Sequence, residues 1–474
     1  MLYMKSNVQK IHEATMRILE RTGVKFHHPD AVKILKEHNI RMDGDVAYFT
    51  EDEIMYWIHK APAVIDLFAA DEKYNVMLGG CHCETATSSG SPQVCDENGK
   101  KRNATMEDYV KLTKIYEMNP NYKINGGIIV FPSDTPIDST ALLMHYMAYT
   151  HSNKTLMTGT GSYDEIEALM QMGIADAGSR DEFEKYPRLL TIINVNTPLQ
   201  LDKKMTETLL TFVKYRQPVV IASAAMAGTS SPITLAGTIA LQNAEVLSTV
   251  ALAQMAAPGA PVIYGSQSTT ADPRNGSIAI GSPEGALCYN YCAQLAKYYE
   301  LPSRAGGALS DAKVVNAQAG YESMMTYLAC RQSGVNLIVH GAGILDSYTC
   351  VSFEKVMMDF EVMEYVNRYL IDIEVDEESI PEELIDELGH EAGYLLSEHT
   401  LDHCHSEPLI PSLAVRGASM DPKGQYEENI KKQMDRLLDK YEKPQKDAAV
   451  LEKMRKILLE RGVGEDLLNT IEAM

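Results

Sequence analysis

Polar side chains close several short apolar segments of this 474-residue chain, where the end of a strand could carry chemistry. His340 ends one segment, Gln267 lies near the end of another, and Asp311 follows a pair of glycines in a third. Asn194 and Asn196 are two residues apart, so they share a face if their segment is a strand. Branched aliphatic residues dominate the core of a strand barrel. We therefore predict that His340, Gln267 and Asp311 are catalytic and that the two asparagines bind substrate.

A structural role is the alternative for each of these residues. An asparagine or serine at a strand end often satisfies only the backbone groups of a loop, and a lone histidine on an apolar strand is commonly a hydrogen-bonded structural residue. Tyr264, three residues before Gln267, suits the core as well as it suits the wall of a ligand pocket.

Eight such segments follow one another between about residue 84 and residue 346, and stretches long enough for a helix separate them. They cover residues 84–88, 124–131, 155–160, 189–196, 219–224, 261–268, 303–311 and 335–343. Eight strand-then-helix units in series predict an α/β fold, the (β/α)8 TIM barrel. Such barrels place their chemistry at the C-terminal ends of the strands, which is where the polar residues above fall.

Helical patterns flank the predicted barrel. We predict an N-terminal helical cap over residues 1–78, the barrel over 79–350, and its last helix with a C-terminal helical extension over 351–474. Thr50, Thr105, Ser162 and Ser282 each stand before acidic residues, as the N-cap of a helix does. The acidic segment over residues 372–379 is typical of a solvated face.

Composition narrows the classes of partner. The formal net charge is −22, from 65 acidic and 43 basic residues, which argues against nucleic acid and anionic membranes. Polar residues interrupt the most apolar stretch, residues 235–257, and the first ten residues lack the apolar segment of a signal peptide. Eight scattered cysteines resemble reduced intracellular thiols. We therefore expect a cytoplasmic protein.

Several catalytic signatures are missing from the sequence. It has no phosphate-binding P-loop, no Gly-x-Ser-x-Gly elbow and no His-Glu-x-x-His. Two Cys/His clusters, at residues 81–95 and 399–405, lack the spacing of familiar zinc sites, so we predict no metal. Gly159 belongs to a Gly-Thr-Gly between a strand and a helix, which is a weak signal for anion binding.

The whole-length pattern resembles the trimethylamine methyltransferase superfamily, in the branch that lacks pyrrolysine and demethylates quaternary amines. The resemblance rests on the N-terminal stretch 11–24, the glycine-rich strand ends with Val-His-Gly-Ala-Gly at 339–343, residues 353–359, and the stretch that begins at His399. It implies a β/α barrel that moves a methyl group to the Co(I) of a separate corrinoid protein, with no cobalamin bound tightly to the chain itself.

A quaternary amine leaves as a neutral tertiary amine, so its demethylation needs neither a general acid nor zinc. Aromatic faces would hold the cation, and Tyr264, Tyr348, Phe131 and Phe353 are the candidates at or just past strand ends. A betaine carboxylate would also need donors. Arg274 is our candidate beside the polar residues named above, because Arg304, early in its strand, is expected to lie too deep and to form a structural ion pair. Gly159, Gly341 and Gly343 are the candidate contacts to the cofactor.

The expected substrate is a quaternary amine such as glycine betaine, proline betaine, carnitine or γ-butyrobetaine. The expected protein partner is the corrinoid protein, and apolar barrel helices favour a homo-oligomer. Two alternatives stay open at this point. One is a metal-assisted lyase or hydrolase that uses the Cys/His clusters, and the other is a non-catalytic barrel that binds a cationic metabolite.

Overall fold

The computed structural model describes residues 2–96, 98–391, 393–418 and 424–474. Its centre is a closed parallel barrel in which neighbouring strands follow the order β10, β11, β13, β15, β18, β19, β6 and β9. Each of the eight predicted apolar segments contains or overlaps one of these strands, so the TIM barrel is confirmed. In chain order the strands are β6 (Glu84–Ala86), β9 (Tyr122–Asn125), β10 (Thr155–Thr158), β11 (Leu189–Val195), β13 (Val219–Ser223), β15 (Val262–Ser266), β18 (Ser303–Gly306) and β19 (Leu337–Val339).

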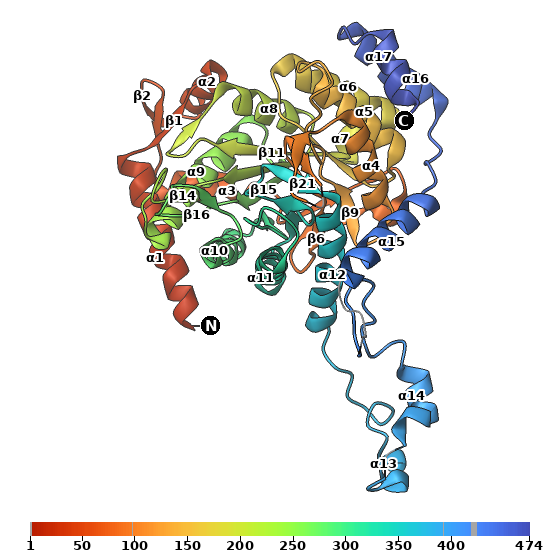
Figure 1. The fold of residues 1–474 in the computed structure, drawn as a ribbon. Helices are drawn as coiled ribbons and strands as arrows, with labels where there is room; N and C mark the ends of the chain where they lie inside the picture. Colours follow the sequence, from red (N-terminus) through yellow and green to blue (C-terminus); the bar gives the residue numbers. More distant parts are fainter. Residues whose placement is uncertain (1, 97, 392, 419–423) are drawn as a thin grey trace.

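One helix or more follows each strand and covers the outside of the barrel (Figure 1). These helices are α4 (Met106–Glu117), α5 (Thr140–His151), α6 (Tyr163–Ala177), α7 (Arg180–Lys185), α8 (Lys203–Lys214), α9 (Leu235–Ala256), α10 (Pro283–Tyr298), α11 (Ala317–Ser333) and α12 (Phe353–Leu370). The predicted starts are confirmed at Thr105 and Ser282, whose side chains accept bonds from the backbone of the first turn. Pro283 lies in the first turn of α10, where a backbone N–H would have no partner within the helix, so the missing N–H of proline costs nothing there.

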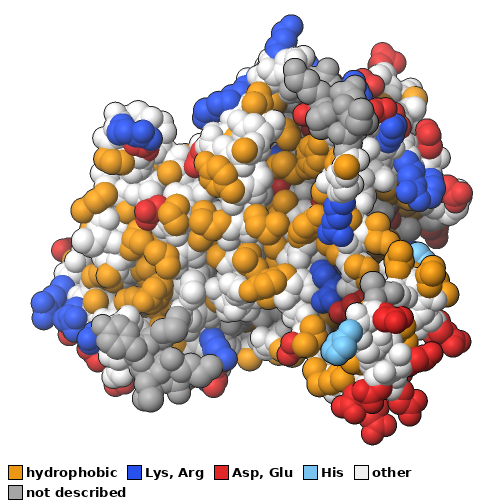
Figure 2. All heavy atoms as spheres, turned by 60° about the horizontal axis from the view of Figure 1, so that its bottom comes forward, with side chains coloured by type: hydrophobic (Ala, Val, Ile, Leu, Met, Phe, Trp, Pro, Cys, Tyr) orange, Lys and Arg blue, Asp and Glu red, His pale blue; other side chains and the backbone are white. Residues whose placement is uncertain are grey.

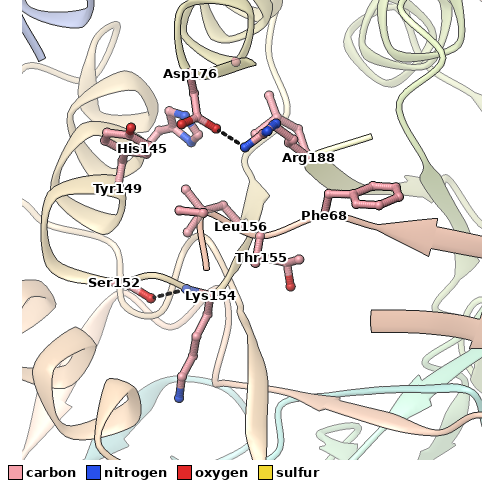
Figure 3. A pocket seen from close by; sticks show the side chains of 13 residues that line it. Phe68, His145, Tyr149, Ser152, Lys154, Thr155, Leu156, Asp176 and Arg188 are labelled. Carbon is pink, nitrogen blue, oxygen red and sulfur yellow. Dashed lines mark hydrogen bonds and ion pairs between the residues drawn. The ribbon is translucent and has the colours of Figure 1, made fainter. Parts of the chain in front are cut away.

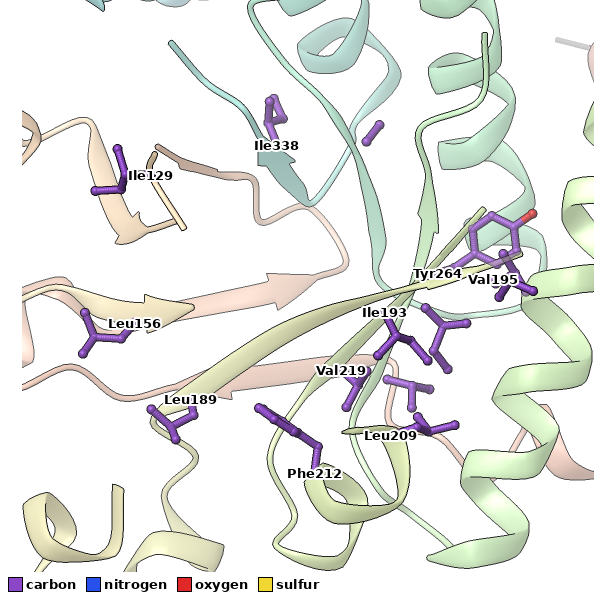
Figure 4. Packing of buried hydrophobic residues seen from close by; sticks show 14 of the residues in the cluster. Ile129, Leu156, Leu189, Ile193, Val195, Leu209, Phe212, Val219, Tyr264 and Ile338 are labelled. Atoms are coloured by element: carbon purple, nitrogen blue, oxygen red, sulfur yellow. The ribbon is translucent and has the colours of Figure 1, made fainter. Parts of the chain in front are cut away.

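Alternation along the strands divides the core into two layers. Leu190, Val220 and Ile263 point into the barrel, where they pack in one cluster. Their neighbours in sequence point outward, toward the helices, and Figure 4 shows Ile193, Val219 and others of this outer layer beside α8 and its neighbours. Because successive side chains face opposite sides of a strand, one barrel strand contributes to both layers.

A hairpin closes the N-terminal end of the barrel. It consists of β4 (Val64–Leu67) and β5 (Val76–Gly79), joined across a short 3-10 turn, η1 (Glu72–Tyr74). Its side chains Ile65, Leu67, Val76 and Leu78 are buried in the same cluster as the inner layer of the barrel. The barrel interior is therefore filled by apolar side chains toward the base, and its open end is the C-terminal one.

The N-terminal segment is not purely helical, which corrects the prediction. It contains α1 (Leu2–Arg21), α2 (Pro29–Glu37) and α3 (Glu51–Ile58), but also β1 (Val24–Phe26), β2 (Arg41–Asp43) and β3 (Val46–Tyr48). These strands form a sheet with β12 (Gln200–Leu201), from the loop after β11. Strands of three residues are too short for an alternating pattern to appear in the sequence. The N-cap predicted at Thr50 is present, because Thr50 and Glu53 form a capping box.

Two small sheets rise from the loops at the C-terminal end of the barrel. One contains β14 (Met226–Ala227), β16 (Thr269–Ala271) and β17 (Ile278–Ala279). The other contains β7 (Gln93–Cys95), β8 (Lys101–Asn103), β20 (Ile344–Leu345) and β21 (Cys350–Ser352). Loops after strands β6, β13, β15 and β19 therefore have defined positions around the mouth.

The C-terminal part is helical. After α12 come α13 (Glu382–Leu388), the short η2 (Tyr394–Leu396) and α14 (Glu398–His403), which extend away from the barrel. The chain returns to the barrel at α15 (Gln425–Lys440) and ends with α16 (Ala448–Glu460) and α17 (Glu465–Glu472). Among the described residues one helix, α9, is long and apolar enough to cross a membrane by composition, and 78% of its most apolar window is buried inside the fold.

Candidate active site

A cavity of about 390 Å³ opens at the C-terminal ends of the barrel strands. Loops and strand ends from around the barrel contribute its walls, in line with the usual site of chemistry in this fold. The lining residues are Ser89, Gly90, Gly126, Ile128, Met157, Thr158, Gly159, Thr160, Ile192, Asn194, Met205, Ala224, Gln267, Ile278, Arg304, His340 and Tyr348. None of these residues is Asp or Glu.

Small residues make room for this cavity inside the barrel. Ala222 and Gly265 lie side by side on β13 and β15, in register across the sheet. A side chain at position 265 would bring its Cβ to 2.8 Å from the Cβ of Ala222, and one at Gly306 would meet the amide of Gln267 at 2.4 Å. These positions therefore leave the upper part of the barrel free for the long side chains of Arg304 and Gln267.

Arg304 is a buried cation without a carboxylate partner among the described residues. It lies on β18, lines the cavity and is 2% exposed. Its Nη1 donates to the carbonyl of Ser266 at 3.4 Å, while Nε has no hydrogen-bond partner. Burial lowers the pKa of the guanidinium. The prediction that Arg304 lies too deep and forms a structural ion pair is therefore wrong, since its side chain reaches the cavity and meets no acidic side chain.

His340 and Tyr348 lie beside each other above this guanidinium. The backbone of His340 has φ +62° and that of Tyr348 has φ +73°, a left-handed conformation that side chains of this size rarely adopt. At His340 this turn breaks the alternation of β19, so its ring lines the cavity although Ile338 faces the helices. The two ring centroids are 5.0 Å apart. Strain of this kind persists where the surrounding structure holds it, often at functional sites.

Neither ring is fully hydrogen-bonded. Nδ1 of His340 and the hydroxyl of Tyr348 are both buried and unpartnered in the described chain. Burial, and then the positive charge of Arg304, hold the pKa of His340 well below its ordinary value. Burial raises the pKa of Tyr348. At neutral pH, therefore, the imidazole is uncharged and the phenol keeps its proton.

Gln267 completes the group of unpartnered polar atoms. Its Nε2 donates to the hydroxyl of Tyr289 at 2.9 Å, and its Oε1 is left without a partner. Tyr289 lies on α10 and is fully buried, so it fixes the orientation of the Gln267 amide. Tyr289 is missing from the predicted site residues because it belongs to an apolar helical stripe, which is the sequence context of an ordinary core residue.

The cavity has two chemically different walls. Gln267, Arg304 and His340 come from or directly follow β15, β18 and β19, which are consecutive in the barrel. The wall formed by the segment after β9, by β10, by β11 and by α8 carries apolar side chains, namely Ile128, Met157, Ile192 and Met205. Asn194, which projects from β11, adds a polar group to this second side. A ligand with one polar end and one apolar end would match this division.

Asp311 and Asn196 have structural contacts instead of places in the cavity wall. Asp311 accepts bonds from the amides of Ile280 and Gly281 at 3.1 and 3.0 Å and from the hydroxyl of Ser347 at 2.5 Å. It therefore connects the loop before α10 to the residue next to Tyr348. The prediction that Asp311 is catalytic is wrong, because its side chain does not line the cavity. Asn196 accepts from the amide of Asp202 at 3.2 Å and is absent from the lining.

The predicted aromatic cage is reduced to Tyr348. Tyr264 faces outward from β15, where it is fully buried and donates to Asn243 on α9 at 2.9 Å. Phe131 packs against the outer core, and Phe353 begins α12 with Lys111 over its ring at 4.7 Å. The alternation of β15 explains the error for Tyr264, since Gln267, three residues later, faces the opposite side.

Arg274 is a surface residue, which corrects its assignment to substrate. Its side chain is 86% exposed and pairs with Asp272 at 2.6 Å. The three glycines predicted to contact the cofactor also differ in their positions relative to the cavity. Gly159 lines the cavity, whereas a Cβ at Gly341 would meet Thr85 at 2.4 Å and one at Gly343 would meet Val356 at 2.6 Å. The last two glycines thus permit close packing of the chain behind the cavity.

The Cys/His clusters gather no metal ligands. Within the described residues, no group of three or more His, Cys, Asp or Glu side chains is arranged to hold a metal ion. Cys95 is buried on β7 next to Cys350 on β21, away from the exposed Cys81. His399 and His403 stack with their centroids 4.4 Å apart, outside the barrel. The alternative of a metal-assisted lyase or hydrolase therefore has no ligand set in this part of the chain.

A second, much smaller cavity lies at the opposite end of the barrel, near the starts of β10 and β11 (Figure 3). Its volume of about 20 Å³ is enough for one water molecule. Arg188 lies against it and pairs with Asp176 at 2.9 Å. The backbone carbonyls of Tyr116 and Asn119 accept bonds from Lys154 at 2.5 and 2.8 Å. At this end Arg188 is thus ion-paired within the chain, and Lys154 is held by backbone carbonyls.

Fold and cavity together define an enzyme of the TIM-barrel class, with a small-molecule site at the mouth of the barrel and unpartnered donors on one wall. The family model described as "Trimethylamine methyltransferase (MTTB)" matches residues 2–463. The chain belongs to this family, and it is a methyltransferase. The resemblance drawn from the sequence is confirmed.

Two relatives and one solved structure illustrate the likeness. The chain is 35% identical to "Glycine betaine methyltransferase" of Desulfitobacterium hafniense (strain Y51), over 98% of each chain. It is 30% identical to the trimethylamine methyltransferase of Methanosarcina thermophila, over 86% of each chain. The crystal structure of the monomethylamine methyltransferase of Methanosarcina barkeri covers 91% of this chain, with 97% of its own length matched, at 12% identity and a TM-score of 0.48. The fold assignment rests on the strand order described above.

Proposed function

We propose that this methyltransferase takes its methyl group from a betaine, that is, a small quaternary amine with a carboxylate, and transfers it to the cobalt of a separate corrinoid protein. Glycine betaine is the first substrate to test, because it is the substrate in the name of a relative 35% identical over 98% of the chain. Proline betaine, carnitine and γ-butyrobetaine follow as longer or bulkier members of the same class.

The observation that carries this proposal is the unpaired guanidinium of Arg304. A buried charge without a partner costs several kcal/mol, and a ligand carboxylate would remove most of that cost. Nε of Arg304 and the hydroxyl of Tyr348 are free donors toward the cavity, and no acidic side chain lines it. A guanidinium and a carboxylate also match in shape, since both groups are planar and can form two parallel hydrogen bonds. We assign the carboxylate to this wall.

The opposite wall suits the quaternary ammonium. Three methyl groups surround its nitrogen, so it donates no hydrogen bond and packs well against Ile128, Met157, Ile192 and Met205. The face of Tyr348 can contribute a cation–π contact of roughly 0.5–2 kcal/mol. The uncharged state of His340 avoids a second positive charge beside Arg304, which the ammonium would otherwise meet.

The protein's own contribution to catalysis is to hold the substrate and to exclude water. Arg304 and Tyr348 fix the carboxylate, and the apolar wall then leaves one N–CH3 bond pointing along the open axis of the cavity. When it docks, the corrinoid supplies a Co(I) nucleophile that accepts the methyl group. The amine leaves uncharged, so no side chain must donate a proton to it. Orientation of this kind can supply roughly 7–11 kcal/mol of the barrier.

The size of the cavity decides where the corrinoid sits. A volume of about 390 Å³ accepts a small quaternary amine but not a corrin ring. The ring would therefore remain on its own protein, which would dock over the open end of the barrel, where Gly159 lines the cavity. We propose accordingly that this chain binds no cobalamin tightly by itself, that the reaction takes place in the cytoplasm and that the enzyme is a homo-oligomer.

A spectroscopic assay tests the proposal. The purified protein is mixed with a Co(I)-corrinoid protein and, separately, with glycine betaine, proline betaine, carnitine, γ-butyrobetaine, choline and trimethylamine. We expect the Co(I) absorbance to disappear with at least one betaine and to persist with choline and trimethylamine, which lack a carboxylate. Binding of a betaine without any change in the corrinoid would instead support the binding-protein alternative. Reaction with trimethylamine but with no betaine would contradict the role given to Arg304.

A further inference from the structure

One segment of the chain projects into solvent as an arm, which we define as residues 371–411. It leaves the barrel at the end of α12, carries α13, η2 and α14, and returns before α15 (Figure 1). Contacts at its base include the ion pair of Arg368 with Glu407 at 3.0 Å and the bond from the guanidinium of Arg416 to the carbonyl of Leu409 at 2.9 Å. Farther out, α14 packs on η2 of the same arm.

The described part of the arm exposes far more apolar surface than the rest of the molecule. Of the twenty-one large hydrophobic side chains that are exposed among the described residues, ten lie in the arm, and they include Leu395 at 81%, Leu396 at 86% and Leu401 at 65%. Together the ten expose on the order of 1,000 Å², whereas each partner in an ordinary stable interface contributes roughly 800 Å². Soluble proteins rarely leave apolar surface of this extent uncovered unless another molecule covers it.

The arm is also strongly acidic. Residues 371–411 contain thirteen Asp and Glu but no Lys or Arg, and Figure 2 shows acidic side chains gathered at its lower right, where the arm comes forward. Ile371, Ile373 and Val375 alternate with three acidic residues in an extended segment, and each of the three is 64–67% exposed. An extended chain with this alternation has one apolar and one acidic face. The apolar face can be covered while the acidic face stays in water.

The short helices of the arm indicate a permanent partner. α13 has seven residues and α14 has six, whereas isolated helices shorter than about 12–15 residues are marginal in water. A protein that docks for one methyl transfer and then leaves would expose this surface to water between encounters. A second copy of the same chain is present wherever the protein is made. Two arms would repel each other through their acidic residues, so each arm must lie on the body of the other copy.

The flank of the barrel beside α12 offers a matching surface. The outward sides of α10 and α11, which pack side by side, carry Leu287, Tyr298 and Tyr321, exposed by 50%, 44% and 63%. Tyr291, Met324 and Leu328 on the same two helices are partly buried against the core. In Figure 1 the arm points away from its own α10 and α11, so an arm that covers this face must come from another copy.

We propose that the protein is a homodimer in which each arm crosses to the partner and covers the outward face of α10 and α11. This inference is independent of the substrate. It assigns the apolar side of the arm to the interface and leaves the cavity of each barrel open for the methyl donor and the corrinoid protein.

The test is the molar mass in solution, measured by light scattering after gel filtration at micromolar concentration. We expect twice the 52.5 kDa of one chain for the wild-type protein. The triple variant Leu395→Ser, Leu396→Ser, Leu401→Ser should weaken dimerisation by at least about a hundredfold and elute as a monomer. The matched control is Ile137→Ser with Ile233→Ser, which replaces side chains exposed by 77% and 64% outside the arm and should remain dimeric.

A mixing experiment separates arm exchange from other dimers. The face variant Leu287→Glu with Tyr321→Glu should also be monomeric by itself. Mixed with the arm variant, it should form a heterodimer, because the intact arm of one chain meets the intact face of the other. A monomeric wild-type protein, a dimeric arm variant, or failure of the two variants to associate would each overturn the proposal. Circular dichroism and corrinoid methylation confirm that the variants keep their folded barrels.

Discussion

The two ends of the barrel each contain an arginine beside a cavity, and the two arginines have opposite surroundings. At the base, Arg188 pairs with Asp176 at 2.9 Å next to a cavity of about 20 Å³ (Figure 3). At the mouth, Arg304 lies against a cavity of about 390 Å³ with no carboxylate partner in the described chain. Among the described residues, Nε is unpartnered in both arginines, but the charge of Arg188 is paired with a carboxylate of its own protein and the charge of Arg304 is not.

This difference shows how a structural charge can be told from a binding charge. A chain gains nothing in stability from burying Arg304 without a counter-ion, since the desolvation of the cation is not offset. We therefore expect the unpaired guanidinium at the mouth to serve ligand binding. The base and the mouth should therefore respond in opposite ways to the same substitution.

The largest expected effect comes from Arg304→Gln compared with Arg188→Gln. Arg304→Gln should lower kcat/KM for a betaine by at least about a hundredfold, because truncating one member of a buried charge pair costs roughly 2–5 kcal/mol. Its melting temperature should stay the same or rise, because a buried unpaired charge disappears. Arg188→Gln should keep the activity and melt at a lower temperature, since Asp176 loses its partner. An equal fall in melting temperature in both variants would contradict the proposed difference between the base and the mouth.

The next largest effect concerns Glu245, a buried carboxyl near the mouth. It accepts bonds from the amide of Leu199 and the hydroxyls of Ser223 and Thr197, at 2.8, 2.6 and 3.0 Å. Burial raises its pKa to about 7. Because the folded state favours the protonated carboxyl, its contribution to stability is complete below pH 4.5 and is lost as the pH rises through 7, for a total of about 3 kcal/mol.

Glu245→Gln stays uncharged at all pH values, so this dependence should vanish. Urea unfolding of both proteins between pH 4.5 and pH 8 measures it. An identical pH dependence in the variant would show that Glu245 does not titrate in this range. Glu300→Gln, a change at another glutamate, is the control and should leave the pH dependence unchanged.

A smaller effect is expected for Tyr348→Phe, which keeps the ring and removes the hydroxyl. If that hydroxyl donates to the substrate carboxylate, KM for a betaine should rise about tenfold, the equivalent of one hydrogen bond to a charged group. The value of kcat should change less, because the ring still bounds the cation. An unchanged KM would show that the hydroxyl of Tyr348 does not bind the carboxylate, which would leave Arg304 as its donor.

The smallest effect is expected for Asp311→Asn. The amide keeps one oxygen that can accept from the backbone of residues 280 and 281, so the loop should loosen without collapse. We expect KM to rise by about threefold, the cost of weakening one bond, with kcat nearly constant. A loss of kcat by more than a hundredfold at constant KM would instead support the catalytic role that the sequence alone suggests for Asp311.

Much of the fold could be predicted because a barrel repeats one pattern. All eight strands fall in or overlap the apolar segments, and the N-caps at Thr50, Thr105 and Ser282 mark three helix starts. The three-residue strands of the N-terminal sheet could not be predicted, because each is too short for a periodic pattern and β1 pairs with β12, which is far away in the sequence. Pairing over such a distance leaves no local signal.

The site was harder to predict, for two physical reasons. Alternation places a strand residue on one face or the other, but sequence alone does not say which face is inside, and this is how Tyr264 was misplaced. At His340 a left-handed backbone overrides the alternation altogether. The position of Arg304 early in its strand suggests a deep residue, but its long side chain extends to the cavity through the space left by Gly265 and Gly306.

The most direct test of the central claim is a binding measurement that does not need the corrinoid protein. Isothermal titration calorimetry compares glycine betaine with choline, which has the same trimethylammonium group but a hydroxyl instead of a carboxylate, in the wild-type protein and in Arg304→Gln. We predict that the wild-type protein binds glycine betaine at least about a hundredfold more tightly than choline, and that the variant shows no preference. If the variant keeps the preference, the carboxylate is bound elsewhere and Arg304 is not its ligand.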